Sequence, residues 1–175
     1  MLIPLPRLFA SGVTMGLVAV VTVGIALAAQ APADPPLSCI TDGTRVRHTY
    51  LRHADPDKLR EAVRIFEQGL QGVDYPEGTV ISAIPTEAMV KRSKGAFPDT
   101  NGWEFLVLNP TADGTTITQR GATAANRLGS CAGCHAAAAA HDFVCEQGHG
   151  CAPVPLTEAI VARLQAADAR CAARK

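Results

Sequence analysis

Two cysteines and a histidine near the carboxyl end of the chain form its most specific chemical pattern. The segment Cys131-Ala132-Gly133-Cys134-His135 is a CxxCH motif, which is typical of covalent attachment of a c-type haem. In this chemistry both thiols bond to the vinyl groups of one porphyrin, and the adjacent imidazole ligates the iron. The sequence therefore predicts one haem c, held by Cys131 and Cys134, with His135 as the proximal ligand of the iron.

The same CxxC pair is also compatible with half of a zinc site or with a redox dithiol. A structural zinc site needs a second pair of ligands. Cys145 and Cys151 have the wrong spacing for such a pair. His141 and His149 lie close to these cysteines in the sequence, so a zinc site stays an alternative. His141 is a poor second iron ligand, because the six steps from His135 turn a helix by roughly 600° and direct the two rings to different faces.

The amino terminus has the layout of a secretory signal peptide. Arg7 precedes an apolar run from Leu8 to Ala29, and Ala29-Gln30-Ala31 provides small residues for cleavage. We interpret residues 1–31 as a signal peptide. The alternative is an uncleaved anchor through residues 8–29, because the run is long enough to span a bilayer. Haem is attached to c-type cytochromes after export, so the motif and the leader together predict a periplasmic protein.

Length and composition fit a single exported domain. The chain has 175 residues and a formal net charge of +0, and removal of about 30 residues leaves roughly 145, a common size for one domain. We assign residues 32–45 to a flexible amino-terminal segment and residues 46–175 to the haem domain. Nucleic acid is excluded as a partner because the chain has no basic stripe interleaved with aromatic residues. If the leader is cleaved, we expect no attachment to a membrane.

The four cysteines outside the haem motif are predicted to form two disulfides. Oxidising conditions outside the cytoplasm favour pairing. Four cysteines can pair in three ways, and the sequence does not choose among them. Our expectation is a short Cys145–Cys151 loop together with a Cys39–Cys171 bridge that ties the two ends of the domain. Free thiols at some of these positions are the alternative.

Two longer helices and one short helix are expected. Asp55-Pro56 is typical of a helix start, and apolar residues then recur at helical spacing as far as Leu70. A second helix is expected from Thr157 to about Ala172. Its inward face would carry Ile160, Leu164, Ala167 and Cys171. The alanine run 136–140 has high helix propensity and places the haem motif at the start of a short helix.

The middle of the chain is predicted to form strands. The segments expected in this conformation are 46–51, 79–84, 103–108 and 117–120. The last two form a hairpin across the Asp113-Gly114 turn. No long helical pattern lies between them. The predicted fold is therefore α+β, a predominantly antiparallel sheet with flanking helices and one covalently bound haem c.

Short sequence blocks in a fixed order surround the haem motif. They are Glu77-Gly78-Thr79-Val80, Val90-Lys91, Phe97-Pro98-Asp99, Gly102-Trp103, the motif itself and Asp142-Phe143-Val144. In this order and spacing, residues 46–144 resemble the cytochrome P-460 family, which includes the related cytochromes c′-β. The resemblance implies a mainly antiparallel β domain with helices, one haem c and, commonly, a homodimer.

The resemblance also separates two kinds of chemistry. Hydroxylamine-oxidising members carry a lysine cross-linked to the porphyrin edge. The matching position in this chain is Ala83. Lys91 and Lys94 lie in the next sequence block and do not match that position. This departure favours the cytochrome c′-β type. Such a site has a histidine on one side of the iron and an open or weakly filled distal side that binds a small diatomic such as nitric oxide. Phe97 and Phe105 are candidate apolar lids for that side.

Two alternative functions stay open, and further residues bear on them. One is an oxidoreductase acting on hydroxylamine, nitric oxide or peroxide, and Glu87 or Glu104 would then relay protons over the iron. The other is a His/Met electron-transfer cytochrome with a redox partner protein, for which Met89 is the candidate ligand. An ordinary apolar role for Met89 is the preferred interpretation.

Arg47 and Trp103 are further candidates for haem contacts. Arg47 occupies a strand position at which the family carries an arginine, and a bidentate guanidinium suits a buried propionate. Trp103 is expected to pack against the haem or the sheet beneath it, with its indole N–H as a donor to a propionate.

Overall fold

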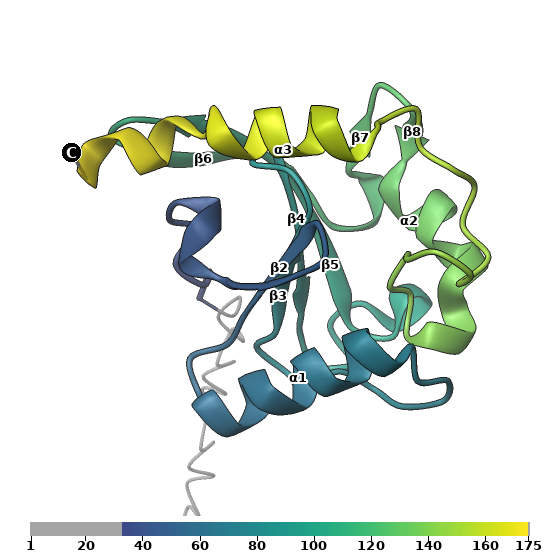
Figure 1. Ribbon diagram of the computed structural model, residues 1–175. Helices are drawn as coiled ribbons and strands as arrows, with labels where there is room; N and C mark the ends of the chain where they lie inside the picture. Colours follow the sequence, from purple (N-terminus) through teal and green to yellow (C-terminus); the bar gives the residue numbers. More distant parts are fainter. Residues whose placement is uncertain (1–32, 175) are drawn as a thin grey trace, which may run out of the picture. The chain divides into compact units, whose positions relative to one another are not determined.

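A computed structural model describes residues 33–174 of the chain (Figure 1). Six strands of this part form one antiparallel sheet in the order β1-β2-β3-β4-β5-β6, and β7 and β8 form a separate ribbon before the CxxCH motif. The bounds are β1 Thr44–Val46, β2 Thr49–Arg52, β3 Val80–Ser82, β4 Glu87–Lys91, β5 Trp103–Thr111, β6 Gly114–Arg120, β7 Ala125–Asn126 and β8 Gly129–Ser130. The signal peptide expected in residues 1–31 and the alternative anchor in residues 8–29 lie outside the described residues.

Helices flank the sheet and complete the predicted α+β fold. The α-helices of the described part are α1 Pro56–Gln68, α2 Cys131–His135 and α3 Glu158–Ala166. Its 3-10 helices are η1 Ile40–Asp42, η2 Pro98–Thr100, η3 Gly121–Thr123, η4 Ala136–His141 and η5 Ala169–Arg174. In Figure 1, α3 runs along the top of the sheet and α1 along the bottom, while α2 lies at the right. Within residues 33–174, none of these helices has the length and apolar character that crossing a bilayer requires.

Helix α1 begins and ends at the predicted residues. The Asp55 side chain accepts hydrogen bonds from two backbone N–H groups of the first turn, at 2.8 and 3.4 Å. Gly69 ends the helix with a φ of 57°, a left-handed conformation that glycine adopts without steric cost. Between these caps, Ile65 and Phe66 are buried and pack on the sheet.

Helix α3 begins at the predicted residue but differs from the prediction in length and in its buried face. Thr157 caps its start, and the α-helix ends at Ala166 before η5. The buried residues of α3 are Val161 and Gln165, whereas Leu164 is exposed. The Gln165 amide donates to two backbone carbonyls beside β2 and β3, at 2.6 and 2.7 Å. These bonds hold a polar face against the sheet, so the apolar pattern indicated the wrong face.

The predicted strand 46–51 is a hairpin and not one strand. Strand β1 ends at Val46 and β2 begins at Thr49, and Arg47 turns the chain with a φ of 54°. The prediction failed here because the turn contains none of the glycine, proline or asparagine residues that usually mark one. Part of the segment 32–45 belongs to this structure, since Thr44 pairs with Leu51 in β1 and β2.

Alternation along the central strands gives the sheet two apolar faces. One face packs on α1 and carries Ile81, Met89, Trp103 and Phe105. The other face packs against Leu37 and carries Val80, Val90, Leu106 and Leu108. The predicted β5–β6 hairpin is present, with Thr111 paired to Gly114 across the turn. Strand β4 was not among the predicted strands.

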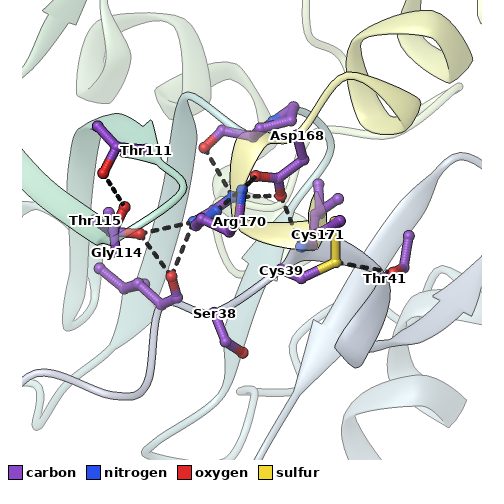
Figure 2. Close-up of polar contacts among 12 residues, drawn as sticks. Ser38, Cys39, Thr41, Thr111, Gly114, Thr115, Asp168, Arg170 and Cys171 are labelled. Atoms are coloured by element: carbon purple, nitrogen blue, oxygen red, sulfur yellow. Dashed lines mark hydrogen bonds and ion pairs between the residues drawn. A yellow bond between two sulfur atoms is a disulfide. The ribbon is translucent and has the colours of Figure 1, made fainter. Parts of the chain in front are cut away.

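Both expected disulfides are present in the structure. Cys145–Cys151 spans 6 residues, and Cys39–Cys171 joins positions 132 residues apart. Figure 2 shows the longer bridge beside a buried ion pair between Asp168 and Arg170, whose atoms approach to 2.8 Å. The free cysteines of the described chain are the two in the CxxCH motif. The four cysteines outside the motif are therefore bridged as expected, and Cys131 and Cys134 are not in disulfides.

Candidate functional site

The CxxCH motif lies on the wall of a cavity of ≈ 330 Å³. Cys131, Cys134 and His135 all line this cavity, so the fold brings the three predicted haem-binding residues together. The other walls come from the sheet, α1 and the segment that leads into α3. Among them are Phe66, Ile81, Met89, Phe105, Val154 and Leu156. The lining is mainly apolar, as in most sites that enclose an organic cofactor.

Local hydrogen bonds start the short helix that carries the motif. The Ser130 hydroxyl accepts from the Gly133 backbone N–H at 3.1 Å and caps α2. Residues three and four apart share one side of a helix, so Cys131, Cys134 and His135 point to the same region. The motif therefore starts a short helix, as predicted. The alanine run continues it as the 3-10 helix η4, which is kinked at Ala138.

The His135 ring is oriented by a hydrogen bond from its Nδ1. This atom lies 2.7 Å from the backbone carbonyl oxygen of Phe143. A carbonyl oxygen only accepts, so Nδ1 carries the proton and Nε2 keeps its lone pair for a metal. Burial lowers the pKa of His135, although the bond to Phe143 and the charge of Glu87 oppose that shift. The Phe105 ring packs on the imidazole with centroids 4.8 Å apart.

The surroundings of Cys131 bear on the redox-dithiol alternative. Burial raises the pKa of Cys131, and the carboxylate of Glu87 adds to this shift. Reactive dithiols instead have a lowered pKa that makes the thiolate available. The environment of Cys131 therefore does not favour this alternative.

Within residues 33–174, no second ligand pair is grouped with the motif cysteines to support the zinc alternative. Cys145 and Cys151 are joined as a disulfide. His141 and His149 stack on one another with centroids 3.7 Å apart. Among the described residues, the one cluster of three metal-ligand side chains comprises Cys39, Asp168 and Cys171, and its two sulfurs are bonded to each other. The motif cysteines do not belong to this cluster.

Apolar side chains at the cavity rim are exposed, and this exposure bears on whether the cavity suits a porphyrin. Leu128 and Val154 both line the cavity, yet they are 60% and 52% exposed. Large exposed apolar side chains beside an apolar cavity indicate a surface that a bound group covers. A porphyrin attached to Cys131 and Cys134 would present such an apolar surface. The residues present therefore fit a haem.

Arg47 and Trp103 do not line the cavity. Arg47 lies in the β1–β2 turn and not in a strand, with its guanidinium 5.1 Å above the ring of Phe66. It also pairs with Glu146 at 3.5 Å. Trp103 is fully buried in the core, 5.6 Å from the ring of Tyr75, and its Nε1 has no hydrogen-bond partner. The structure does not bring either residue to the motif, and their propionate contacts stay predictions.

The two candidate proton relays occupy different surroundings. Glu87 lines the cavity, and its Oε1 accepts from the Asn126 amide at 2.9 Å. Glu104 does not line the cavity, because it is buried in ion pairs with Arg92 at 2.9 Å and Arg120 at 3.4 Å. Of these two carboxylates, Glu87 is the one placed to exchange a proton with a ligand in the cavity.

The candidate lids, Phe97 and Phe105, and the candidate thioether ligand, Met89, differ in whether they line the cavity. Phe105 lines the cavity on the side of His135, whereas Phe97 is not among its lining residues. Met89 lines the cavity from β4 and is buried in the same apolar cluster as Phe105. This burial is compatible with the preferred apolar role of Met89, and its position in the cavity wall is compatible with the ligand role as well.

Ala83, which the family resemblance matches to the cross-linking lysine, lines the cavity. Lys91 and Lys94 lie elsewhere, in ion pairs with Asp142 and Asp74. In the part of the chain that the structure describes, no lysine lines the cavity. The described cavity therefore has no amine for a bond to the porphyrin edge.

Sequence reasoning missed the groups that orient the site. These are the backbone carbonyl of Phe143, which holds His135, and the amide of Asn126, which holds Glu87. A backbone acceptor leaves no signal in residue type. The one available signal was the block Asp142-Phe143-Val144 shortly after the motif.

One comparison with known proteins bears on the site. The family model described as Cytochrome P460 matches residues 82–146, a range that contains the CxxCH motif, Glu87 and Phe143. The match supports the resemblance inferred from the sequence blocks within residues 82–146, and the matched family suggests a haem protein. No curated protein and no solved structure matches the chain.

Proposed function

We propose that this haem protein, whose residues 82–146 match the cytochrome P460 family, binds one covalent haem c and takes a small neutral diatomic such as nitric oxide as its ligand. The observation that carries the proposal is that Cys131, Cys134 and His135 share one cavity wall, with Nδ1 of His135 bound to a carbonyl. Each thiol would add across one vinyl group, and His135 Nε2 would ligate the iron. When bound, haem iron supplies an axial ligand site and a one-electron couple.

The cavity walls support a neutral ligand over an ionic one. Ile81, Met89 and Val161 line the cavity with apolar groups. Transfer of an unpaired charge into such surroundings is costly. Nitric oxide carries no charge and requires no hydrogen-bond partner. Together with Ala83 at the cross-link position, these walls favour gas binding over hydroxylamine oxidation.

A second candidate function is favoured by Glu87. Its carboxylate lines the cavity and is held by Asn126, and a positioned carboxylate can accept or deliver a proton. An oxidoreductase acting on peroxide or on a small nitrogen species would use this group. A third candidate, His/Met electron transfer to a partner protein, rests on the presence of Met89 in the cavity wall.

The proposed function requires export of the chain to the periplasm. Covalent haem attachment follows export, and the Cys39–Cys171 and Cys145–Cys151 bridges form under oxidising conditions. We therefore propose a mature periplasmic chain that begins after residues 1–31. A homodimer is part of the same proposal, through the family resemblance alone.

Absorption spectra of the purified protein distinguish gas binding from His/Met electron transfer and test for a cross-linked porphyrin. We expect ordinary c-type bands in the reduced protein and a clear spectral change on addition of nitric oxide, because an open distal position accepts the gas. Low-spin bands that do not respond to nitric oxide would instead support Met89 as the sixth ligand. A strongly red-shifted reduced band would indicate a cross-linked porphyrin and contradict the assignment based on Ala83.

Replacement of Glu87 by glutamine tests the enzymatic alternative. If Glu87 transfers a proton, peroxide turnover should fall by about 100-fold in Glu87→Gln, a typical loss for a general acid or base. Nitric oxide binding should persist in the same variant. Glu158→Gln is the matched control, because Glu158 also lines the cavity but is exposed on α3. An equal loss of turnover in the control would contradict the role of Glu87.

A further inference from the structure

The backbone that presents the Phe143 carbonyl to His135 has an unusual conformation. Asp142 and Phe143 have φ angles of 51° and 62°. The left-handed region is unfavourable for residues that carry a Cβ atom. Two consecutive residues remain in it only where the surrounding contacts hold them. The direction of the Phe143 carbonyl therefore depends on the contacts that hold Asp142.

The Asp142 carboxylate is held by four hydrogen bonds. Lys91 Nζ donates to both oxygens at 2.7 Å. The Asn101 amide donates to Oδ1 at 2.6 Å, and the Tyr75 backbone N–H donates to Oδ2 at 2.8 Å. The side chains of Lys91 and Asp142 are 3% and 2% exposed. This buried pair is fully satisfied and shielded from solvent.

Lys91 connects this pair to the sheet that forms the cavity wall. It lies in β4, two and four residues beyond Met89 and Glu87, which both line the cavity. Side chains at this spacing in a strand point to the same face. Lys91 Nζ also donates to the Asn101 carbonyl at 2.7 Å and lies 5.2 Å from the ring of Trp103. The cavity wall is thereby fastened to the segment that orients His135.

Stability alone is a weak explanation for such a pair. A buried ion pair is often no more stabilising than apolar residues of similar volume, because both charges lose their hydration. A fully satisfied polar network does, however, impose one geometry on the groups that it joins. In this chain the imposed geometry is that of the residue immediately before the acceptor of the His135 hydrogen bond.

We propose that Lys91 and Asp142 are positioning residues for His135 and set the reduction potential of the haem. They hold the Phe143 carbonyl in place, and this carbonyl makes the imidazole a stronger donor to the iron. A stronger donor stabilises the oxidised metal and keeps the potential low. The inference rests on the proposed function, because it requires that the haem be bound.

The midpoint potential of the haem-loaded protein tests this inference. The double variant Lys91→Met/Asp142→Asn removes both charges and leaves neither unpaired. We expect its potential to rise, because loss of the carbonyl acceptor weakens His135 as a ligand of oxidised iron. Loss of such a supporting hydrogen bond typically costs metal affinity 10–100-fold. A tenfold change in the relative affinity for the two oxidation states corresponds to about 59 mV for a one-electron couple.

Another buried ion pair, Asp168–Arg170, provides a matched control. Asp168 and Arg170 are 0% and 6% exposed and lie beside the Cys39–Cys171 bridge (Figure 2). Neither residue lines the cavity. The variant Asp168→Asn/Arg170→Met should change the unfolding temperature and leave the potential at the wild-type value. An equal rise in this control would show general loosening of the fold and overturn the proposal.

A milder variant keeps the test decisive if the double variant does not fold. Asn101→Gly removes one donor to Asp142 and suits the left-handed φ of 50° at this position. It should raise the potential by a smaller amount. Unchanged potentials in haem-loaded variants would overturn the inference alone. Absence of haem from the wild-type protein would overturn the proposed function, and the inference with it.

Discussion

Replacement of both motif cysteines by alanine should abolish the covalently bound haem. The variant Cys131→Ala/Cys134→Ala has no thiol in the cavity that could form a thioether, since the other four cysteines are paired in Cys39–Cys171 and Cys145–Cys151. We expect the mass of the exported chain to fall to that of the polypeptide with two disulfides. After denaturation and acid extraction, the variant should retain no colour, whereas the wild type should keep its haem.

Loss of the porphyrin should also affect the folded protein. The cavity of ≈ 330 Å³ would be left without its apolar occupant, and Leu128 and Val154 would stay exposed at its rim. Burial of apolar surface contributes roughly 25 cal/mol per Å², so the variant should unfold at a lower temperature than the haem-loaded wild type. The variant Cys145→Ala/Cys151→Ala is the control and should retain covalent haem. Covalent haem in the motif variant would refute the site.

The sequence predicted the features whose causes are local. The haem motif is five adjacent residues, and α1 is bounded by Asp55 and Gly69, whose side-chain and backbone preferences act within one turn. Such features depend on residue type and spacing, which a sequence displays directly. The disulfide pairing is a different case, because the sequence left three pairings open and the structure contains the expected one.

The features that escaped prediction depend on pairing between distant parts of the chain. Strand β4 has the sequence Glu87-Ala88-Met89-Val90-Lys91, in which most residues favour a helix. Its conformation comes from hydrogen bonding to β3 on one side and β5 on the other. The contacts of Lys91 with Asp142, and of Phe143 with His135, likewise join residues that only the fold brings together.

The longer disulfide should contribute more to stability than the shorter one. Cys39 and Cys171 are 132 residues apart, whereas Cys145 and Cys151 are 6 apart. In the chain-entropy description, a bridge stabilises the fold by restricting the unfolded chain, and its effect grows with loop length. We expect the variant Cys39→Ala/Cys171→Ala to lose about 4–5 kcal/mol of unfolding free energy and Cys145→Ala/Cys151→Ala to lose about 2 kcal/mol.

The folded state around the longer bridge should survive its removal. Asp168 accepts a hydrogen bond from the Ile40 backbone N–H at 2.8 Å, and Arg170 donates to the carbonyls of Leu37 and Pro85 at 3.0 and 3.1 Å. Figure 2 shows Asp168 and Arg170 beside the bridge. These bonds join the two ends of the domain whether or not the sulfurs are linked. The loss of unfolding free energy should therefore arise mainly from the unfolded chain, whose conformational entropy increases when the bridge is removed.

Guanidinium unfolding of the haem-loaded variants provides the measurement. The chain contains one tryptophan, and Trp103 is fully buried in the core, so its fluorescence reports unfolding together with the haem absorbance. The denaturant slope should increase in Cys39→Ala/Cys171→Ala, because its unfolded chain exposes more surface. Since single domains are usually stable by about 5–15 kcal/mol, this variant should lie near the limit of folding. An equal or larger loss in Cys145→Ala/Cys151→Ala would contradict the entropic explanation and indicate that the short loop stabilises the folded state directly.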